Sequence, residues 1–174
     1  VMQISKESIF SGLNHLMVNN VFSTDSDEMF GFTPKEVKGL CAEYGHPEKF
    51  EEAREWYDGY RFGDAEIYNP WSILNYVHYG FKAEGYWAGT SGNSIIDTLL
   101  DMADGSVYSD LRALGEGKPV VKDIDTRISY ADMTSVNGIY CVMVLSGYLK
   151  AAPVDHGFAL SIPNTEMFDV FGKM

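Results

Sequence analysis

Apolar residues recur at helical spacing in the first part of the chain. Between Lys6 and Val18 they stand three and four residues apart, which predicts a helix there. Further helix starts are predicted where a capping residue precedes proline, at Thr33-Pro34-Lys35-Glu36, His46-Pro47 and Asn69-Pro70. The glycines at 45 and 80 are expected to end the first and last of these helices. Between them, 59–63 is expected to be a turn and 66–68 a short extended piece.

The pattern changes in the second half. Helices are expected over 94–102, 107–114 and 133–145, and a short strand over 119–121. Alternating residues in 147–151 and 158–162 flank a turn-forming segment and predict a β-hairpin. The order helix, helix, strand, helix, hairpin resembles a winged-helix module. We therefore expect a mainly α chain with a small β component (α+β), in which a helical lid-like bundle in 1–87 precedes a winged-helix-like module in 88–174.

Composition and charge narrow the class of protein. The chain has 174 residues, 45% of them hydrophobic, and a formal net charge of -12. Such acidity disfavours contacts with phosphate backbones and anionic membranes. Two cysteines outside any CxxC pair, together with the lack of a signal-peptide pattern, predict a cytoplasmic protein. Both ends interrupt an expected element, so we expect the chain to be an excised part of a longer one.

No phosphate-binding loop can be found. Glycine is followed by lysine at Gly117-Lys118-Pro119 and Gly172-Lys173-Met174, and neither run continues with Ser or Thr. A triphosphate needs a cluster of backbone donors beside that lysine. We therefore expect no cofactor in this chain and no catalytic residue, so that the chain alone is not an enzyme.

A metal site is not expected either. The four histidines are dispersed, with no HxxxH or HExxH spacing. Asp104 followed by Glu116-Gly117-Lys118 spells a nuclease-like D…ExK pattern, but the flanking glycines and Pro119 predict a turn rather than a rigid strand. The pattern is therefore interpreted as a loop.

The densest cluster of aromatic and charged residues is the run Trp56-Tyr57-Asp58-Gly59-Tyr60-Arg61-Phe62-Gly63. It could present Asp58 and Arg61 to a ligand or partner, because arginine pairs well with phosphate or carboxylate. The favoured alternative is structural, with an Asp58–Arg61 pair and buried aromatic rings. The helix start at Asn69-Pro70-Trp71 could face an anion or simply be a well-made cap. Ser11 and Asn14, after the first extended residues, could face a ligand or pack between helices.

Several runs together resemble a known family, the predicted AAA-ATPase-like proteins of bacteria, which usually carry a PD-(D/E)XK nuclease-like domain after the ATPase part. In chain order the runs are Phe10-Ser11-Gly12-Leu13-Asn14, Trp56-Tyr57-Asp58-Gly59-Tyr60-Arg61-Phe62, Ile67-Tyr68-Asn69-Pro70-Trp71-Ser72, Tyr86-Trp87 with Thr90-Ser91, Leu145-Ser146-Gly147-Tyr148-Leu149 and Leu160-Ser161-Ile162-Pro163-Asn164. The resemblance covers nearly the whole chain. The tyrosine-rich run and the Asn-Pro-Trp-Ser run are its most specific parts.

The resemblance implies a position within a larger protein. This chain would be the end of the ATPase core, the helical lid and a winged-helix-like region. Ser11 and Asn14 would correspond to a sensor of the γ-phosphate, and the helix beginning at Asn69 to a lid element over the nucleotide. ATP and Mg²⁺ would belong to the full-length parent, and its ATPase core and nuclease-like domain would be this chain's partners.

Two other functions stay open. A protein-interaction module could use the Trp56–Phe62 cluster, with Tyr57, Asp58, Tyr60 and Arg61 or the Asn69–Trp71 helix start as docking residues and a homo-oligomer as one outcome. Nucleic-acid binding through the helix over 133–145 is the least favoured, because that helix has no Lys or Arg.

Overall fold

The computed structural model describes residues 19–87, 98, 101, 103–125 and 135–172. These residues form an α+β protein with two compact units. One, here called the helical unit, contains 22–87 and 162–172. The other, the sheet unit, contains 19–21 and the described residues from 98 to 161. The chain thus leaves the helical unit and returns to it before α7 (Thr165–Gly172), while the expected functional division at 1–87 and 88–174 stays a prediction.

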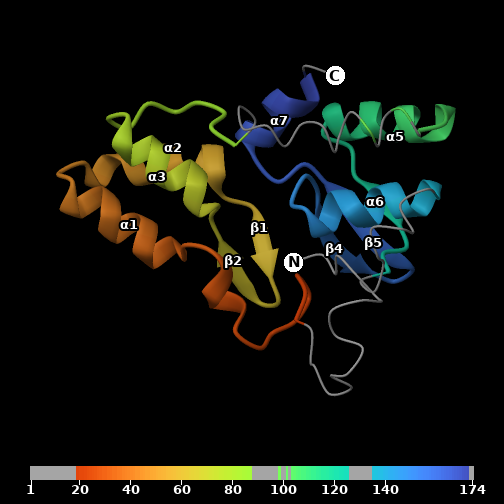
Figure 1. The fold of residues 1–174 in the computed structure, drawn as a ribbon, viewed down its shortest axis with the longest axis horizontal. Helices are drawn as coiled ribbons and strands as arrows, with labels where there is room; N and C mark the ends of the chain where they lie inside the picture. Colours follow the sequence, from red (N-terminus) through yellow and green to blue (C-terminus); the bar gives the residue numbers. More distant parts are fainter. Residues whose placement is uncertain (1–18, 88–97, 99–100, 102, 126–134, 173–174) are drawn as a thin grey trace. The chain divides into compact units, whose positions relative to one another are not determined.

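The helical unit is built around a bundle of α-helices. Figure 1 shows α1 (Pro34–Glu43), α2 (Phe50–Tyr57) and α3 (Pro70–His78) side by side, with α7 (Thr165–Gly172) packing on α2. Two short 3₁₀ turns, η1 (Asp27–Phe30) and η2 (Pro47–Lys49), precede α1 and α2. The buried core of the bundle consists of Val37, Cys41, Ala53, Tyr57, Tyr68, Ile73, Tyr76 and Phe81.

The predicted helix starts at Thr33-Pro34 and Asn69-Pro70 are confirmed, whereas at His46-Pro47 a short 3₁₀ turn begins without a side-chain cap and α2 starts three residues later, at Phe50. Glu36 accepts a hydrogen bond from the backbone N–H of Thr33 at 2.8 Å, while the Thr33 hydroxyl accepts one from the Glu36 N–H at 3.4 Å. This is a complete capping box. Asn69 caps α3 by accepting a hydrogen bond from the Trp71 N–H at 3.0 Å. Gly45 and Gly80 follow α1 and α3 with positive φ, as expected of residues that end a helix.

The prediction of a turn over 59–63 is wrong for most of these residues. Tyr60–Phe62 is a strand, β1, which pairs antiparallel with β2 (Ala65–Ile67). Only Gly63 and Asp64 separate Phe62 from its partner Ala65, so the loop is as short as a hairpin allows. Tyrosine and phenylalanine favour an extended backbone, and pairing with the expected extended piece provides the backbone hydrogen bonds.

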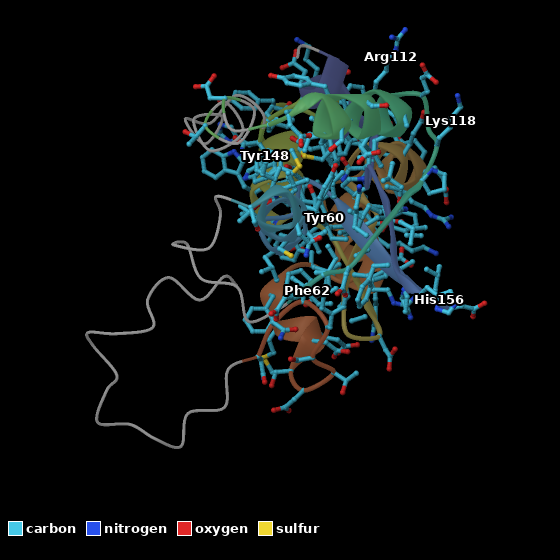
Figure 2. All side chains as sticks on the ribbon, turned by 90° about the vertical axis from the view of Figure 1, so that its right-hand side faces the viewer. Tyr60, Phe62, Arg112, Lys118, Tyr148 and His156 are labelled. Carbon is cyan, nitrogen blue, oxygen red and sulfur yellow. The ribbon has the colours of Figure 1, made fainter. Side chains whose placement is uncertain are left out.

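The sheet unit contains the predicted hairpin and its neighbours. It runs from α5 (Gly105–Gly115) through β3 (Val120–Lys122) and α6 (Val136–Leu145) to β4 (Lys150–Val154) and β5 (Gly157–Ser161). The strand order is β3-β5-β4, antiparallel throughout. The helices over 107–114 and 133–145, the strand and the existence of the hairpin are thereby confirmed where residues are described. The first hairpin strand begins later than expected, at Lys150, and Pro153, expected in the turn, pairs with Phe158 inside the hairpin. Figure 2 shows His156 at the β4–β5 turn, and Arg112 and Lys118 around the end of α5, pointing outward.

Helix α6 is surrounded on all sides. Every residue from Gly138 to Leu145 is buried. A helix that is apolar all round belongs in a core, and it has no free face to lay into a nucleic-acid groove. The expectations for 6–18 and for most of 94–102 lie outside the described residues.

A compact polar cluster ties three elements of the sheet unit together. The Lys122 ammonium on β3 lies 2.7 Å from a carboxylate oxygen of Asp110 on α5. The hydroxyl of Tyr140 on α6 donates to the same oxygen at 2.5 Å, and the ammonium sits 4.6 Å from the centre of the tyrosine ring. Burial opposes ionisation of Asp110, but the hydrogen bonds from Lys122 and Tyr140 outweigh it and hold the pKa of Asp110 below its usual value.

Candidate functional site

Tyr57, the last residue of α2, belongs to the core. Its side chain is fully buried, and its hydroxyl donates to the Glu84 carbonyl at 3.0 Å while accepting from the Glu84 N–H at 3.1 Å. Burial raises the pKa of the Tyr57 phenol. The ring also packs edge-on against Tyr76, with 5.4 Å between ring centroids. Tyr57 therefore holds the segment after α3 against α2 and presents no docking surface.

The expected Asp58–Arg61 pair is wrong. Asp58 lies 3.8 Å from the Arg54 guanidinium, one helical turn back, and Arg61 lies 3.6 Å from Asp64 across the hairpin loop. The reason is the strand: an extended chain advances about 3.3 Å per residue, which carries Arg61 away from Asp58. Tyr60, half-buried, stands opposite Ile67, while Arg61 is largely exposed. A hydrogen bond with Asp58 raises the pKa of Glu66 on β2.

The tyrosine-rich run meets the Ser-Ile-Pro-Asn run that lies about a hundred positions further along. Gly59 has φ of 102°, and a β-carbon at this position would lie 2.1 Å from the carbonyl oxygen of Pro163. The Asn164 side-chain amide donates to the Asp58 carbonyl at 2.8 Å, and the Thr165 hydroxyl donates to the Glu55 carbonyl at 3.0 Å. Only glycine fits this contact between the two runs.

The start of α3 is also held by contacts with residues beyond the helix. Asn69 caps the helix, Pro70 occupies its first turn, and the Trp71 indole donates to the Tyr86 carbonyl at 3.3 Å. The ring of Tyr86 stacks on Tyr79 with 5.7 Å between centroids. Trp71 nevertheless remains 52% exposed. Of the predicted interaction residues, Trp71 and Arg61 are thus the ones that offer large side chains to solvent.

A buried carboxylate, Glu166 on α7, lies where these runs converge. It is 0% exposed, and its two oxygens accept from the Ser72 hydroxyl and from the Trp87 N–H, each at 2.7 Å. Burial raises the pKa of Glu166, although both hydrogen bonds oppose that rise. Asn164, also buried, caps α7 by accepting from the Met167 N–H at 3.0 Å. We call Glu166, Ser72 and Trp87 the Glu166 junction.

Sequence reasoning assigned no role to Glu166, although a signal was present. Glu166, Met167 and Val170 share one face of α7, because positions three and four apart are neighbours on a helix. Two of these three are apolar and all three are buried. A carboxylate on the apolar face of a helix is costly without partners and so indicates a specific hydrogen-bonded contact.

The nuclease-like pattern is not assembled as a metal site. Asp104 accepts hydrogen bonds from the backbone of Ser106 and Val107 as the N-cap of α5, and Glu116 pairs with Lys118 at 2.7 Å. Among the described residues no three metal-ligating side chains gather.

Ser11 and Asn14, the expected sensor residues, lie outside the described part of the chain. Within that part, no helix combines the length and the hydropathy of a membrane span.

Comparison with known proteins gives one distant relative. The chain is 27% identical over 172 residues to an "Uncharacterized protein in vnfD 5'region" of Azotobacter chroococcum mcd 1. The match covers 96% of this chain and 31% of the relative, so the chain spans about a third of that protein's length. No protein-family profile matches the chain. No solved structure is significantly similar to it.

Proposed function

We propose that this chain is the non-catalytic, lid-like regulatory part of an AAA-like ATPase, which relays nucleotide state to an attached nuclease-like domain. The family resemblance suggests this role, and a relative more than three times as long is compatible with it. ATP, Mg²⁺ and both partner domains belong in this proposal to the full-length protein.

The Glu166 junction is the observation that carries the proposal. Ser72 lies in the first turn of α3, the helix that would cover the nucleotide, and Glu166 lies in α7, 94 positions further along. A displacement of the α3 start therefore changes hydrogen bonds on α7 directly. Relay of a ligand signal requires such an element whose contacts differ between two states.

The first test is the complete open reading frame. The proposal expects a GxxxxGK[ST] run upstream of Val1, and a complete frame without one would overturn it. The purified 174-residue chain should show no ATP binding in titration calorimetry, because the phosphate-binding donors would lie in the upstream part. Micromolar, Mg²⁺-dependent binding by the chain alone would also contradict the proposal.

The second test uses the full-length protein. Glu166→Gln should leave ATP hydrolysis within about twofold of wild type, a change below 0.5 kcal/mol, and should abolish the effect of nucleotide on the attached domain's nuclease activity. Lys118→Gln, at an exposed position in the sheet unit, is the matched control and should change neither. A Glu166→Gln protein whose nuclease activity still responds to nucleotide, or one that loses ATP hydrolysis as well, would argue against a relay at this junction.

The alternative is docking through the Trp56–Phe62 cluster. The burial of its aromatic residues makes this alternative less favourable. Tyr57 is fully buried, and Trp56, Tyr60 and Phe62 are half-buried. A light-scattering dimer lost on Tyr60→Ala, with the fold retained, would favour this alternative.

A further inference from the structure

An apolar groove lies between α1 and α3 of the helical unit. Its volume is about 740 Å³. It is lined chiefly by Leu40 of α1 and Tyr44 just after it, by Trp71 and Leu74 of α3, and by the buried ring of Phe81 beyond α3. This groove does not belong to the Glu166 junction, and no step of the proposed relay uses it.

Large apolar side chains stand exposed along the groove. Tyr44 is 60% exposed, and Trp71 and Leu74 are each 52% exposed. Trp71 and Leu74 are three positions apart and therefore form a ridge on one face of α3. An exposed apolar surface with this continuity marks an interaction site more often than isolated surface residues do.

The charges around the groove have one sign. On α1 the exposed neighbours of Leu40 are Glu36 and Glu43, whereas Lys35 and Lys38 stand at spacings that place them on another face. Helix α3 carries no Asp, Glu, Lys or Arg. The border is therefore apolar on the α3 side and acidic on the α1 side.

The bases near the groove do not change this sign. Two histidines line it: His46 is held by Glu48 at 3.1 Å, and His78, at the end of α3, packs edge-on against the Tyr79 ring with 4.9 Å between centroids. Lys82, next to Phe81, is paired with Glu84. The whole chain is strongly acidic as well, with a net charge of -12. A second copy of the chain would bring like charge to this border, whereas a basic partner would be attracted.

We propose that the α1–α3 groove binds an amphipathic helix of a partner protein, with apolar side chains against Trp71, Leu74 and Tyr44 and with Lys or Arg side chains facing Glu36 and Glu43. Two helices bordering an apolar groove provide the geometry of helix-in-groove recognition, in which the ligand helix inserts residues at i, i+3, i+4 and i+7. Charge on the border then selects basic helices over acidic ones.

The test uses two synthetic helical peptides with leucine at those positions. One carries lysine and the other glutamate at all remaining positions. In titration calorimetry with the 174-residue chain, the lysine peptide should bind at least about tenfold more tightly than the glutamate peptide, and its affinity should fall with added salt. Absence of binding, or equal binding of both peptides, would overturn the proposal.

Variants locate the binding surface. Leu74→Asp should weaken binding of the lysine peptide at least about tenfold. Met29→Asp, at a more exposed apolar position outside the groove, should leave it unchanged. Tyr44→Ala provides a second groove variant, and circular dichroism checks that each variant is folded. Equal effects of Leu74→Asp and Met29→Asp, or a concentration-dependent homodimer that Leu74→Asp dissolves, would contradict a basic helix as the occupant.

Discussion

The carbonyl oxygen of Pro163 lies against the α-carbon of Gly59, closer than any side chain at that position would permit. A β-carbon there would stand 2.1 Å from that oxygen, and the backbone has φ of 102°. The lack of space for a β-carbon and the positive φ therefore both require glycine at position 59. This contact joins the chain after α2 to the residues that lead into α7 within the helical unit.

Gly59→Ala is expected to destabilise the protein by at least about 2 kcal/mol, because the clash adds to the cost of positive φ. Gly39→Ala is the matched control. Gly39 lies inside α1 with open space around its α-carbon, so alanine should stabilise the helix by about 0.5–1 kcal/mol. Urea unfolding of both variants measures the difference. Equal stability of the two variants would contradict the contact with Pro163.

Removing the carboxylate at the Glu166 junction should be costly. Glu166→Ala leaves the Ser72 hydroxyl and the Trp87 N–H buried without an acceptor, and we expect a loss of about 2–4 kcal/mol in the free energy of unfolding. Ser72→Ala removes one donor and should cost less, about 1–2 kcal/mol. Denaturant titration of both variants provides the test, and a Glu166→Ala protein as stable as wild type would rule out the junction.

Stability should also depend on pH through Glu166. Its folded-state pKa is raised by burial, so the folded protein binds the proton more tightly than the unfolded chain. The stabilisation from this group is complete below the unfolded-state pKa of about 4.3 and is lost as pH rises through the folded-state pKa. Wild type should therefore lose stability relative to Glu166→Gln over that window. Thermal unfolding across a pH series measures it, and the opposite slope would contradict the burial.

In the sheet unit, Tyr140→Phe should cost about 1.5–3 kcal/mol, because it removes a hydrogen bond to the ionised Asp110 while keeping the ring beneath Lys122. Tyr44→Phe, at a largely exposed tyrosine, serves as the control and should change stability by less than about 0.5 kcal/mol. Differential scanning calorimetry compares them. If both variants unfold at the same temperature, the Asp110–Tyr140 hydrogen bond is not a source of stability.

The helix starts could be predicted because their signals are local. Thr33 and Glu36 lie three positions apart, and Asn69 caps a helix that begins with the next residue. Their hydrogen bonds need no knowledge of the rest of the chain. The β4–β5 hairpin was predictable for the same reason, since its strands adjoin in sequence, although Pro153 lies in β4 and not in the turn.

The contacts between runs that are far apart in the sequence could not be predicted from such local signals. The partners of Glu166 lie 94 and 79 positions before it. The Asp58–Arg61 pair was wrong because it assumed a turn, whereas pairing with β2 keeps Tyr60–Phe62 extended. The winged-helix resemblance and the functional division at 1–87 and 88–174 remain predictions, as do the sensor roles of Ser11 and Asn14.

The return of the chain to the helical unit has a consequence for biosynthesis. Ser72 leaves the ribosome 94 residues before Glu166, a delay of roughly 5–20 s at ~5–20 residues per second. Throughout that interval α3 exists without its carboxylate acceptor, while the sheet unit is being translated. A nascent chain arrested before Ile162 should therefore be cleaved by protease between α2 and α3, and one extended past Gly172 should resist.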